Sequence, residues 1–261
     1  METLFETLLH NDSIYLSSRP GMGDTTLIVN LADAYLKSYA NKNIAIFSYD
    51  ITSSRGIGAS DCFGARFQAR ESENELYELI RLVKNGAFEG KMLPHNDRII
   101  YFEGPGFTAN TIKISILNSD TVGFVCLDAP LFSDKNANHP ADDNEIAKML
   151  QWLKERGIKF AWASSLCRSI EKRIRALPRR SDFIKAHEMF DVTVSIYREE
   201  YYLYDNFIKI RTDKGWRKVA YTFNQVCWPK KEEIRIFYQG KRRVRVVPVL
   251  FDFAHQRVTE K

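Results

Sequence analysis

Apolar residues recur along the chain in two alternating patterns. Uninterrupted apolar runs predict buried parallel strands, and these runs lie at 14–16, 44–49, 98–102, 122–128 and 160–165. Between them, apolar positions three or four residues apart predict helices at 25–39, 76–83, 111–118 and 146–153. Strands that alternate with helices favour a three-layer α/β fold built on a mostly parallel sheet.

The pattern changes in the last third of the chain, where strands follow one another without helices between them. Further strands are predicted at 191–197, 201–204, 208–211 and 219–223, with a hairpin turn at Asp213-Lys214-Gly215. We therefore expect antiparallel strands at the edge of the sheet. We divide the chain into a core domain at 1–227 and a basic, β-rich C-terminal extension at 228–261.

One loop connects the first predicted strand to the first predicted helix. It reads Ser18-Arg19-Pro20-Gly21-Met22-Gly23-Asp24-Thr25-Thr26, and its spacing is close to the phosphate-binding P-loop, G-x-x-x-x-G-K-[ST]. In a P-loop the backbone N–H groups contact phosphate oxygens, the lysine neutralises their charge and the hydroxyl holds Mg²⁺. Asp24 stands at the lysine position, where an anion replaces a cation. The alternative is an ordinary strand-to-helix turn with an acid in the first helical turn.

Polar residues follow three of the other predicted strands. Asp50, Asp128 and Ser165 each end an apolar run. Because ligands of parallel sheets bind at the carboxyl ends of the strands, we expect these residues beside the loop. Asp128 is typical of the Walker B acid that holds Mg²⁺. Taken singly, each of the three is also compatible with a helix cap or a turn.

Charge is distributed unevenly along the 261 residues. The chain carries a net charge of +5, but the segment from Asp205 onward holds 14 Lys/Arg against 6 Asp/Glu. This excess favours contact with an anion, including nucleic acid, or forms a solvated basic face. The strip from Lys241 to Val247 is either an edge strand guarded by cations or a nucleic-acid patch.

Composition also limits the location of the protein. No apolar run reaches the ~18 residues of a membrane span. The four cysteines are scattered and form no C-x-x-C pair, as expected for reduced thiols in a cytoplasmic protein.

Together these motifs resemble the RecA-like C-terminal motor domain of DnaB-type replicative DNA helicases. The resemblance runs from about residue 4 to residue 223, and the loop is similar to the family's A-R-P-x-M-G-K-T-T, with a degenerate Walker A motif. Five other stretches resemble family motifs. Phe47-Ser48-Tyr49-Asp50-Ile51 is similar to the family's F-S-L-E-M, and Val125-Cys126-Leu127-Asp128 is similar to its Walker B motif, I-V-I-D. Residues 164–173 resemble S-Q-L-N-R-S-L-E-x-R, residues 196–200 resemble I-Y-R-D-E, and Lys209-Ile210-Arg211 resembles K-x-R.

The resemblance implies a RecA-like P-loop NTPase fold that uses ATP and Mg²⁺. It assigns nucleotide contacts to Ser18, Arg19, Gly21, Gly23, Asp24, Thr25, Thr26, Lys209 and Arg211, and metal contacts to Thr25 and Asp128. It places Asp50 at the catalytic-acid position and Ser165 at the sensor of the γ-phosphate. DNA contacts fall to Arg173, Arg175, Arg179, Arg180 and Lys185, in a segment that matches a loop tracking single-stranded DNA. Solvent exposure, or pairing with Glu171 and Asp182, is the alternative for these cations.

The departures from the family pattern fall at positions that carry the family's nucleotide chemistry. Asp24 replaces a lysine, Asp50 a glutamate and Ser165 a glutamine. We therefore expect a helicase-like protein that is deficient in ATP hydrolysis and acts by binding single-stranded DNA or replication proteins. One alternative is an active ATP-dependent DNA helicase in DNA replication, with Arg19, Arg55 or a neighbouring subunit supplying the cation. Another is a protein-interaction module that binds neither nucleotide nor DNA.

The sequence also bears on assembly. The family's N-terminal domain and linker helix have no counterpart in these 261 residues. We take this as an argument against the family's hexameric ring, and other oligomers stay open.

Overall fold

The computed structural model describes most of the predicted core. The described residues are 3–19, 22–49, 92–93, 96–104, 106–117, 119–135, 139–166, 170, 177–198, 207–212, 215–220, 232–252 and 257–261. The predicted helix at 76–83 and the predicted strand at 201–204 lie outside these residues.

Ten strands form one large sheet in the order β14-β13-β12-β9-β1-β8-β6-β2-β4-β3. Six neighbouring strands are parallel: β9 (Val192–Arg198), β1 (Ser13–Ser18), β8 (Lys159–Ser165), β6 (Val122–Asp128), β2 (Asn43–Tyr49) and β4 (Asn96–Gly104). The outer strands are antiparallel: β3 (Met92–Leu93) on one side, and β12 (Glu232–Tyr238), β13 (Val244–Asp252) and β14 (Arg257–Glu260) on the other. The predicted parallel sheet with antiparallel edges is confirmed.

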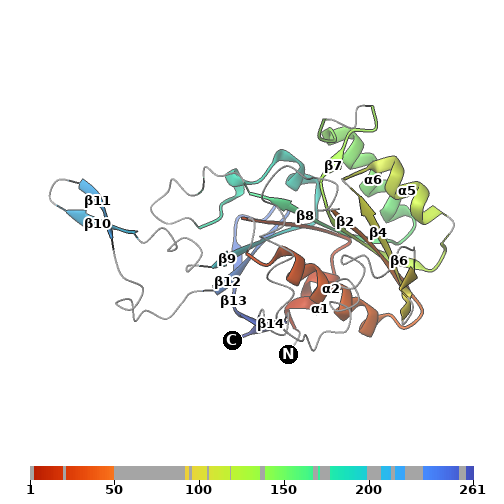
Figure 1. Cartoon of the computed structure of the whole chain (residues 1–261), viewed down its shortest axis with the longest axis horizontal. Coiled ribbons are helices and arrows are strands. Elements are labelled where there is room, and N and C mark those ends of the chain that lie inside the picture. Colours follow the sequence, from red (N-terminus) through yellow and green to blue (C-terminus); the bar gives the residue numbers. More distant parts are fainter. Residues whose placement is uncertain are drawn as a thin grey trace.

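Helices cover both faces of this sheet (Figure 1). α1 (Leu4–Leu9) and α2 (Asp24–Ser38) pack on one face, and α5 (Ala109–Leu117) and α6 (Asp143–Glu155) pack on the other. Side chains of a strand alternate between the two faces. Ile14 and Leu16 of β1 therefore join the core under α2, while Tyr15 joins the core under α6. The three-layer arrangement is confirmed.

Helices α5 and α6 begin where side chains satisfy free backbone N–H groups. At the start of α6 the Asp142 carboxylate accepts from the N–H of Glu145 (2.8 Å), whose own carboxylate accepts from the N–H of Asp142 (3.0 Å). Before α5, the hydroxyl of Thr108 accepts from the N–H of Thr111 (3.2 Å). Thr108 therefore supplies a side-chain hydrogen bond at the start of α5. The six-residue α1 is too short to show a helical period, and the pattern did not predict it.

Short elements complete the fold. β5 (Phe107–Thr108) pairs with β7 (Leu131–Phe132), and two 3₁₀ turns, η2 (Arg180–Asp182) and η3 (Lys185–Met189), precede β9. β10 (Phe207–Thr212) and β11 (Gly215–Ala220) form their own two-stranded antiparallel sheet, which confirms the predicted hairpin. β12 pairs directly with β9, so β12, β13 and β14 widen the large sheet. In the part of the chain that the structure describes, no helix has the length and apolar character needed to cross a bilayer.

Candidate nucleotide site

The loop between β1 and α2 has the backbone of an anion site. Gly23 caps α2 with a φ of 110°, a left-handed conformation that favours glycine, and it offers no side-chain hydrogen bond to the first turn. The fully buried Met22 anchors the loop, and its N–H donates to the carbonyl oxygen of Arg19 (3.1 Å). Gly23 therefore supplies no side-chain cap to the start of α2, and helix N-termini preceded by glycine are suited to bind phosphate.

The carboxyl of Asp24 turns back into this loop. Its Oδ1 accepts a hydrogen bond from the hydroxyl of Ser18 (2.6 Å), a side chain with no exposed surface. The pKa of Asp24 is raised to about 7: burial is the main cause, the Ser18 hydrogen bond lowers the pKa, and the nearby Asp128 carboxylate adds to the rise. At neutral pH this position therefore holds a mixture of neutral acid and anion, and neither form neutralises a phosphate.

The predicted metal ligands lie together. The hydroxyl of Thr25 donates to Oδ2 of Asp128 at 2.7 Å, although the two residues are 103 positions apart. Thr25 follows β1 and Asp128 ends β6, and β8 lies between these two strands. The start of α2 therefore reaches across β8 to the end of β6. A hydroxyl and a carboxylate are the groups that hold Mg²⁺ in P-loop proteins, where phosphate oxygens and water complete the shell. Among the described residues, no group of three or more His, Cys, Asp or Glu would hold a metal by itself.

Arg19 fixes the loop to the end of β8. Its guanidinium is buried and donates to the carbonyl oxygen of Leu166 (3.0 Å), while the N–H of Leu166 donates to the carbonyl oxygen of Ser18 (2.8 Å). Ser18 and Ser165 are direct partners in the parallel pairing of β1 with β8. The exposed Ser165 therefore ends its strand beside the loop, where the sequence placed a sensor residue.

The other predicted residues divide into three groups. Thr26 is buried in the first turn of α2, and Lys209 and Arg211 lie on β10, of which the structure describes only the backbone. Asp50, Gly21, Arg173 and Arg175 lie outside the described residues, as do Cys62, Cys167 and Cys227, while Cys126 is a buried free thiol. Arg179 is exposed, Arg180 donates to the carbonyl of Tyr238 (2.8 Å), and Lys185 lies 3.7 Å from the carboxylate of Asp143.

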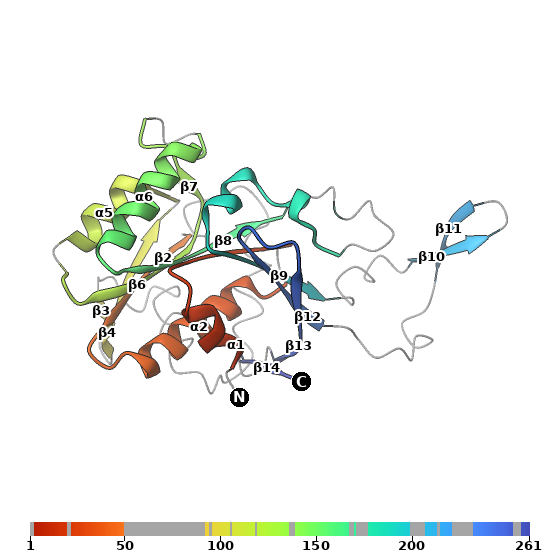
Figure 2. The same ribbon diagram turned by 180° about the vertical axis from the view of Figure 1, so that it is seen from behind.

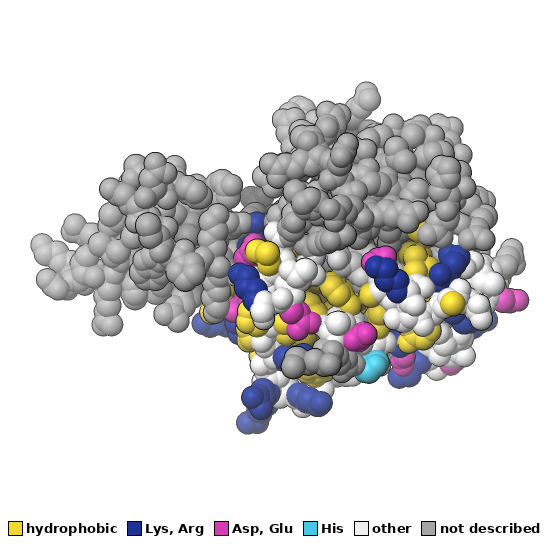
Figure 3. All heavy atoms as spheres, turned by 90° about the horizontal axis from the view of Figure 1, so that it is seen from below, with side chains coloured by type: hydrophobic (Ala, Val, Ile, Leu, Met, Phe, Trp, Pro, Cys, Tyr) yellow, Lys and Arg dark blue, Asp and Glu magenta, His cyan; other side chains and the backbone are white. Residues whose placement is uncertain are grey.

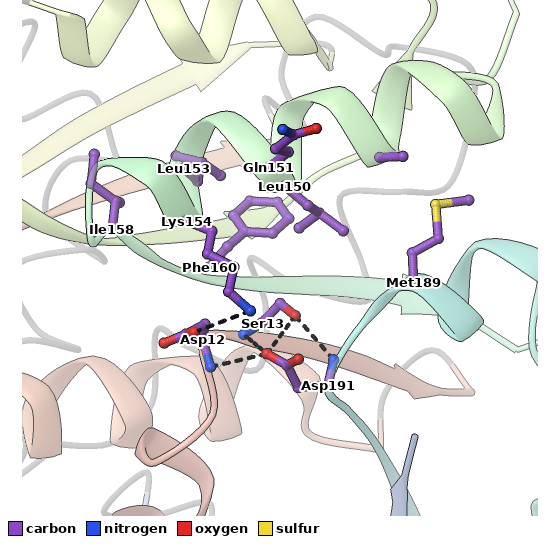
Figure 4. Close-up of a pocket in the computed structure, with 11 residues that line it drawn as sticks. Asp12, Ser13, Leu150, Gln151, Leu153, Lys154, Ile158, Phe160, Met189 and Asp191 are labelled. Atoms are coloured by element: carbon purple, nitrogen blue, oxygen red, sulfur yellow. Dashed lines mark hydrogen bonds and ion pairs between the residues drawn. The ribbon is translucent and has the colours of Figure 1, made fainter. Parts of the chain in front are cut away.

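A second polar cluster lies at the amino ends of the parallel strands, on the other side of the sheet's length from the nucleotide loop (Figure 4). It borders a hollow of about 220 Å³. Oδ2 of Asp191 accepts from the N–H groups of Asp12 (3.1 Å) and Ser13 (2.9 Å) and from the Ser13 hydroxyl (3.0 Å). Lys154 and Lys159 pair with the carboxylate of Asp12. These groups satisfy one another and join the starts of β1, β8 and β9, so we assign the cluster to the stability of the fold. The sequence pattern did not indicate it.

Comparison with solved structures gives relatives of the same architecture. A solved ATPase domain aligns with a TM-score of 0.56 and 17% identity, over 95% of this chain and 84% of that one. A DnaB-like replicative helicase, whose structure was described with its interactions with primase, aligns with a TM-score of 0.51 and 17% identity, over 95% of this chain and 57% of that one. At this identity the likeness establishes the fold.

Family assignment comes from the sequence itself. A search of curated proteins found no match. The DnaB-like helicase C-terminal domain family matches residues 1–259, almost the whole chain. The RecA-like fold expected from the motifs is therefore confirmed, and the chain belongs to the DnaB-like helicase C-terminal domain family.

Proposed function

We propose that this protein is a helicase-like relative whose nucleotide site has lost ATP hydrolysis, and that it acts by binding single-stranded DNA or a replication protein. The observation that carries the proposal is the Asp24 carboxyl, which is hydrogen-bonded inside the loop that would receive a phosphate. The departures at Asp50 and Ser165 point the same way, because they fall at the catalytic-acid and sensor positions.

The cost of Asp24 to phosphate binding is large. Two like charges about 4 Å apart repel by roughly 4 kcal/mol at the dielectric typical of a protein surface. A micromolar complex has a binding free energy of only about 8 kcal/mol. The anionic form of Asp24 meets this repulsion, and the neutral form, which is present up to about pH 7, still lacks the lysine's attraction, so both forms weaken the site.

The metal half of the site fits better than the phosphate half. Thr25 and Asp128 are positioned to hold Mg²⁺, which when bound would neutralise charge on phosphate oxygens. The proposed replacement cation Arg19 already donates to the Leu166 carbonyl within the fold. Arg55 lies outside the described residues. The described residues thus retain a metal pair and have an acid in place of the phosphate clamp.

The proposed partners rest on the family. Its members include replicative helicases, and one solved relative was studied with primase. Single-stranded DNA and replication proteins are accordingly the first partners to test, and binding of neither would favour the interaction-module alternative.

Phosphate release from ATP tests the proposal. The native chain is incubated with ATP, Mg²⁺ and single-stranded DNA, with an Asp128→Asn variant to measure the background. We expect the native rate to equal that of the variant. A native rate well above the background, stimulated by DNA, would establish the active helicase instead.

A further inference from the structure

Two basic segments that lie far apart in the sequence meet in the fold. The turn between β12 and β13 lies beside the segment from η2 to the start of β9 (Figure 2). The guanidinium of Arg180 donates to the carbonyl oxygens of Tyr238 and Lys241, and the side chain of Gln239 donates to the carbonyl of Glu188 (2.7 Å). The turn is therefore fixed in place, and Arg180 acts as its clamp.

Four basic side chains lie at this junction, and we call them the basic rim. They are Arg179, Lys241, Arg242 and Arg243, and all four are exposed. None of them forms an ion pair with another residue that the structure describes. Two described acids lie at the junction: Asp182, which accepts from the N–H of Arg179 (2.6 Å), and Glu188, which lines the adjoining hollow. The rim is therefore strongly positive.

Charge is distributed unevenly over the described part of the face drawn in Figure 3. Over much of the face in Figure 3, basic and acidic side chains lie close together, and a group of basic side chains projects from its lower edge. Paired charges largely cancel, whereas unpaired cations gathered on one turn produce a field that attracts polyanions.

A hollow of about 380 Å³ lies next to the rim, between η2, η3 and the β12–β13 turn. Polar groups of Ser181, His187, Thr193 and Gln239 line part of it. Such groups, together with Arg and Lys, supply the contacts to phosphate and sugar in protein–nucleic acid complexes. The hollow lies at the amino end of β9, whereas the nucleotide loop follows the carboxyl end of the neighbouring parallel strand β1.

We propose that the basic rim binds the phosphate backbone of a single-stranded nucleic acid. Lys241, Arg242 and Arg243 are consecutive on the exposed turn before β13, so their cations can contact neighbouring phosphates of one strand. Each guanidinium donates two parallel hydrogen bonds to a phosphate. The proposal shares its ligand with the proposed function and does not depend on Asp24 or on the loss of hydrolysis.

The test is fluorescence anisotropy with a labelled oligothymidine of about 20 nucleotides, a site size covering several phosphates. The rim variant is Lys241→Gln/Arg242→Gln/Arg243→Gln. The control is Lys37→Gln/Lys42→Gln/Lys148→Gln, which removes the same charge from exposed lysines elsewhere. Arg180 is left intact so that the turn keeps its position.

We expect the rim variant to bind at least about 10-fold more weakly at low salt. The slope of log affinity against log salt should fall by about 2, since each phosphate contact in a single strand contributes about 0.7. The control should keep the native slope. Equal losses in the two variants, an unchanged rim variant, or a native chain that does not bind would overturn the proposal.

A labelled polyglutamate peptide separates the two kinds of polyanion. Binding of the peptide through the rim, without binding of the oligonucleotide, would overturn the proposal in favour of an acidic protein partner. ATP hydrolysis measured on the same preparations judges the proposed function separately, because the rim lies away from the nucleotide loop.

Discussion

Replacing Asp24 by asparagine removes a charge and keeps the shape of the side chain. The amide oxygen of asparagine can still accept the hydrogen bond from the Ser18 hydroxyl. The substitution therefore separates the cost of the buried charge from the benefit of the hydrogen bond. We expect a stability difference that depends on pH.

The size of this difference follows from the pKa of Asp24. Burial raises it from 3.8 to about 7. Between these values the folded protein keeps a proton that the unfolded chain releases, so stability falls as the pH rises through this window. One pKa unit corresponds to about 1.4 kcal/mol, which sets an upper limit of about 4 kcal/mol. Because the side chain retains some contact with solvent, we expect about 2 kcal/mol.

Urea unfolding of the native chain and of Asp24→Asn at several pH values measures the contribution of the Asp24 charge to the free energy of unfolding. Near pH 4 the two should have similar free energies of unfolding, and near pH 8 the variant should be more stable by about 2 kcal/mol. Asp33→Asn is a matched control on the exposed side of α2 and should show no such trend. A difference between Asp24→Asn and native that does not change with pH would refute the raised pKa and the burial that causes it.

Three further predictions concern groups that hold the site and the sheet. Arg19→Ala should lower the free energy of unfolding by about 2 kcal/mol in urea, because it removes a charged donor to the buried Leu166 carbonyl; an unchanged midpoint would argue against this lock. Gly23→Ala should cost about 1–2 kcal/mol by thermal melting, because alanine is strained at a φ of 110°; an equal or higher melting temperature would exclude that loop conformation. Asp191→Ala should cost about 2–3 kcal/mol, because it leaves the Ser13 N–H without its acceptor, and Asp191→Asn should restore part of the loss; identical effects of the two substitutions would remove the hydrogen bonds from the explanation.

The sheet was largely predictable because its central strands are buried on both faces. All of β1 and nearly all of β6 are buried, and such strands read in sequence as continuous apolar runs. Helix α6 was predictable for a related reason, since Ile146, Met149 and Leu153 recur at helical spacing. The order of the strands was not predicted, because an apolar run does not identify its neighbours in the sheet.

The site was predictable in its composition and less so in its contacts. Spacing alone placed Thr25 and Asp128 at a shared edge of the sheet, and the structure joins them by a hydrogen bond. The bond from Ser18 to Asp24 was not predicted, because the conformation of a loop depends on contacts that its sequence does not show. The pairing of Arg180 with the β12–β13 turn was missed for the same reason, since it joins residues about 60 positions apart.

The affinity for ATP across a charge series at position 24 tests the central claim most directly. Calorimetric titration with ATP and Mg²⁺ compares the native chain with Asp24→Asn and Asp24→Lys. We predict binding no tighter than millimolar for the native chain, at least about 10-fold tighter binding for asparagine and a further gain for lysine, since each step removes repulsion or adds attraction at the phosphates. Micromolar binding by the native chain, with no gain from either substitution, would contradict the claim that Asp24 excludes the nucleotide.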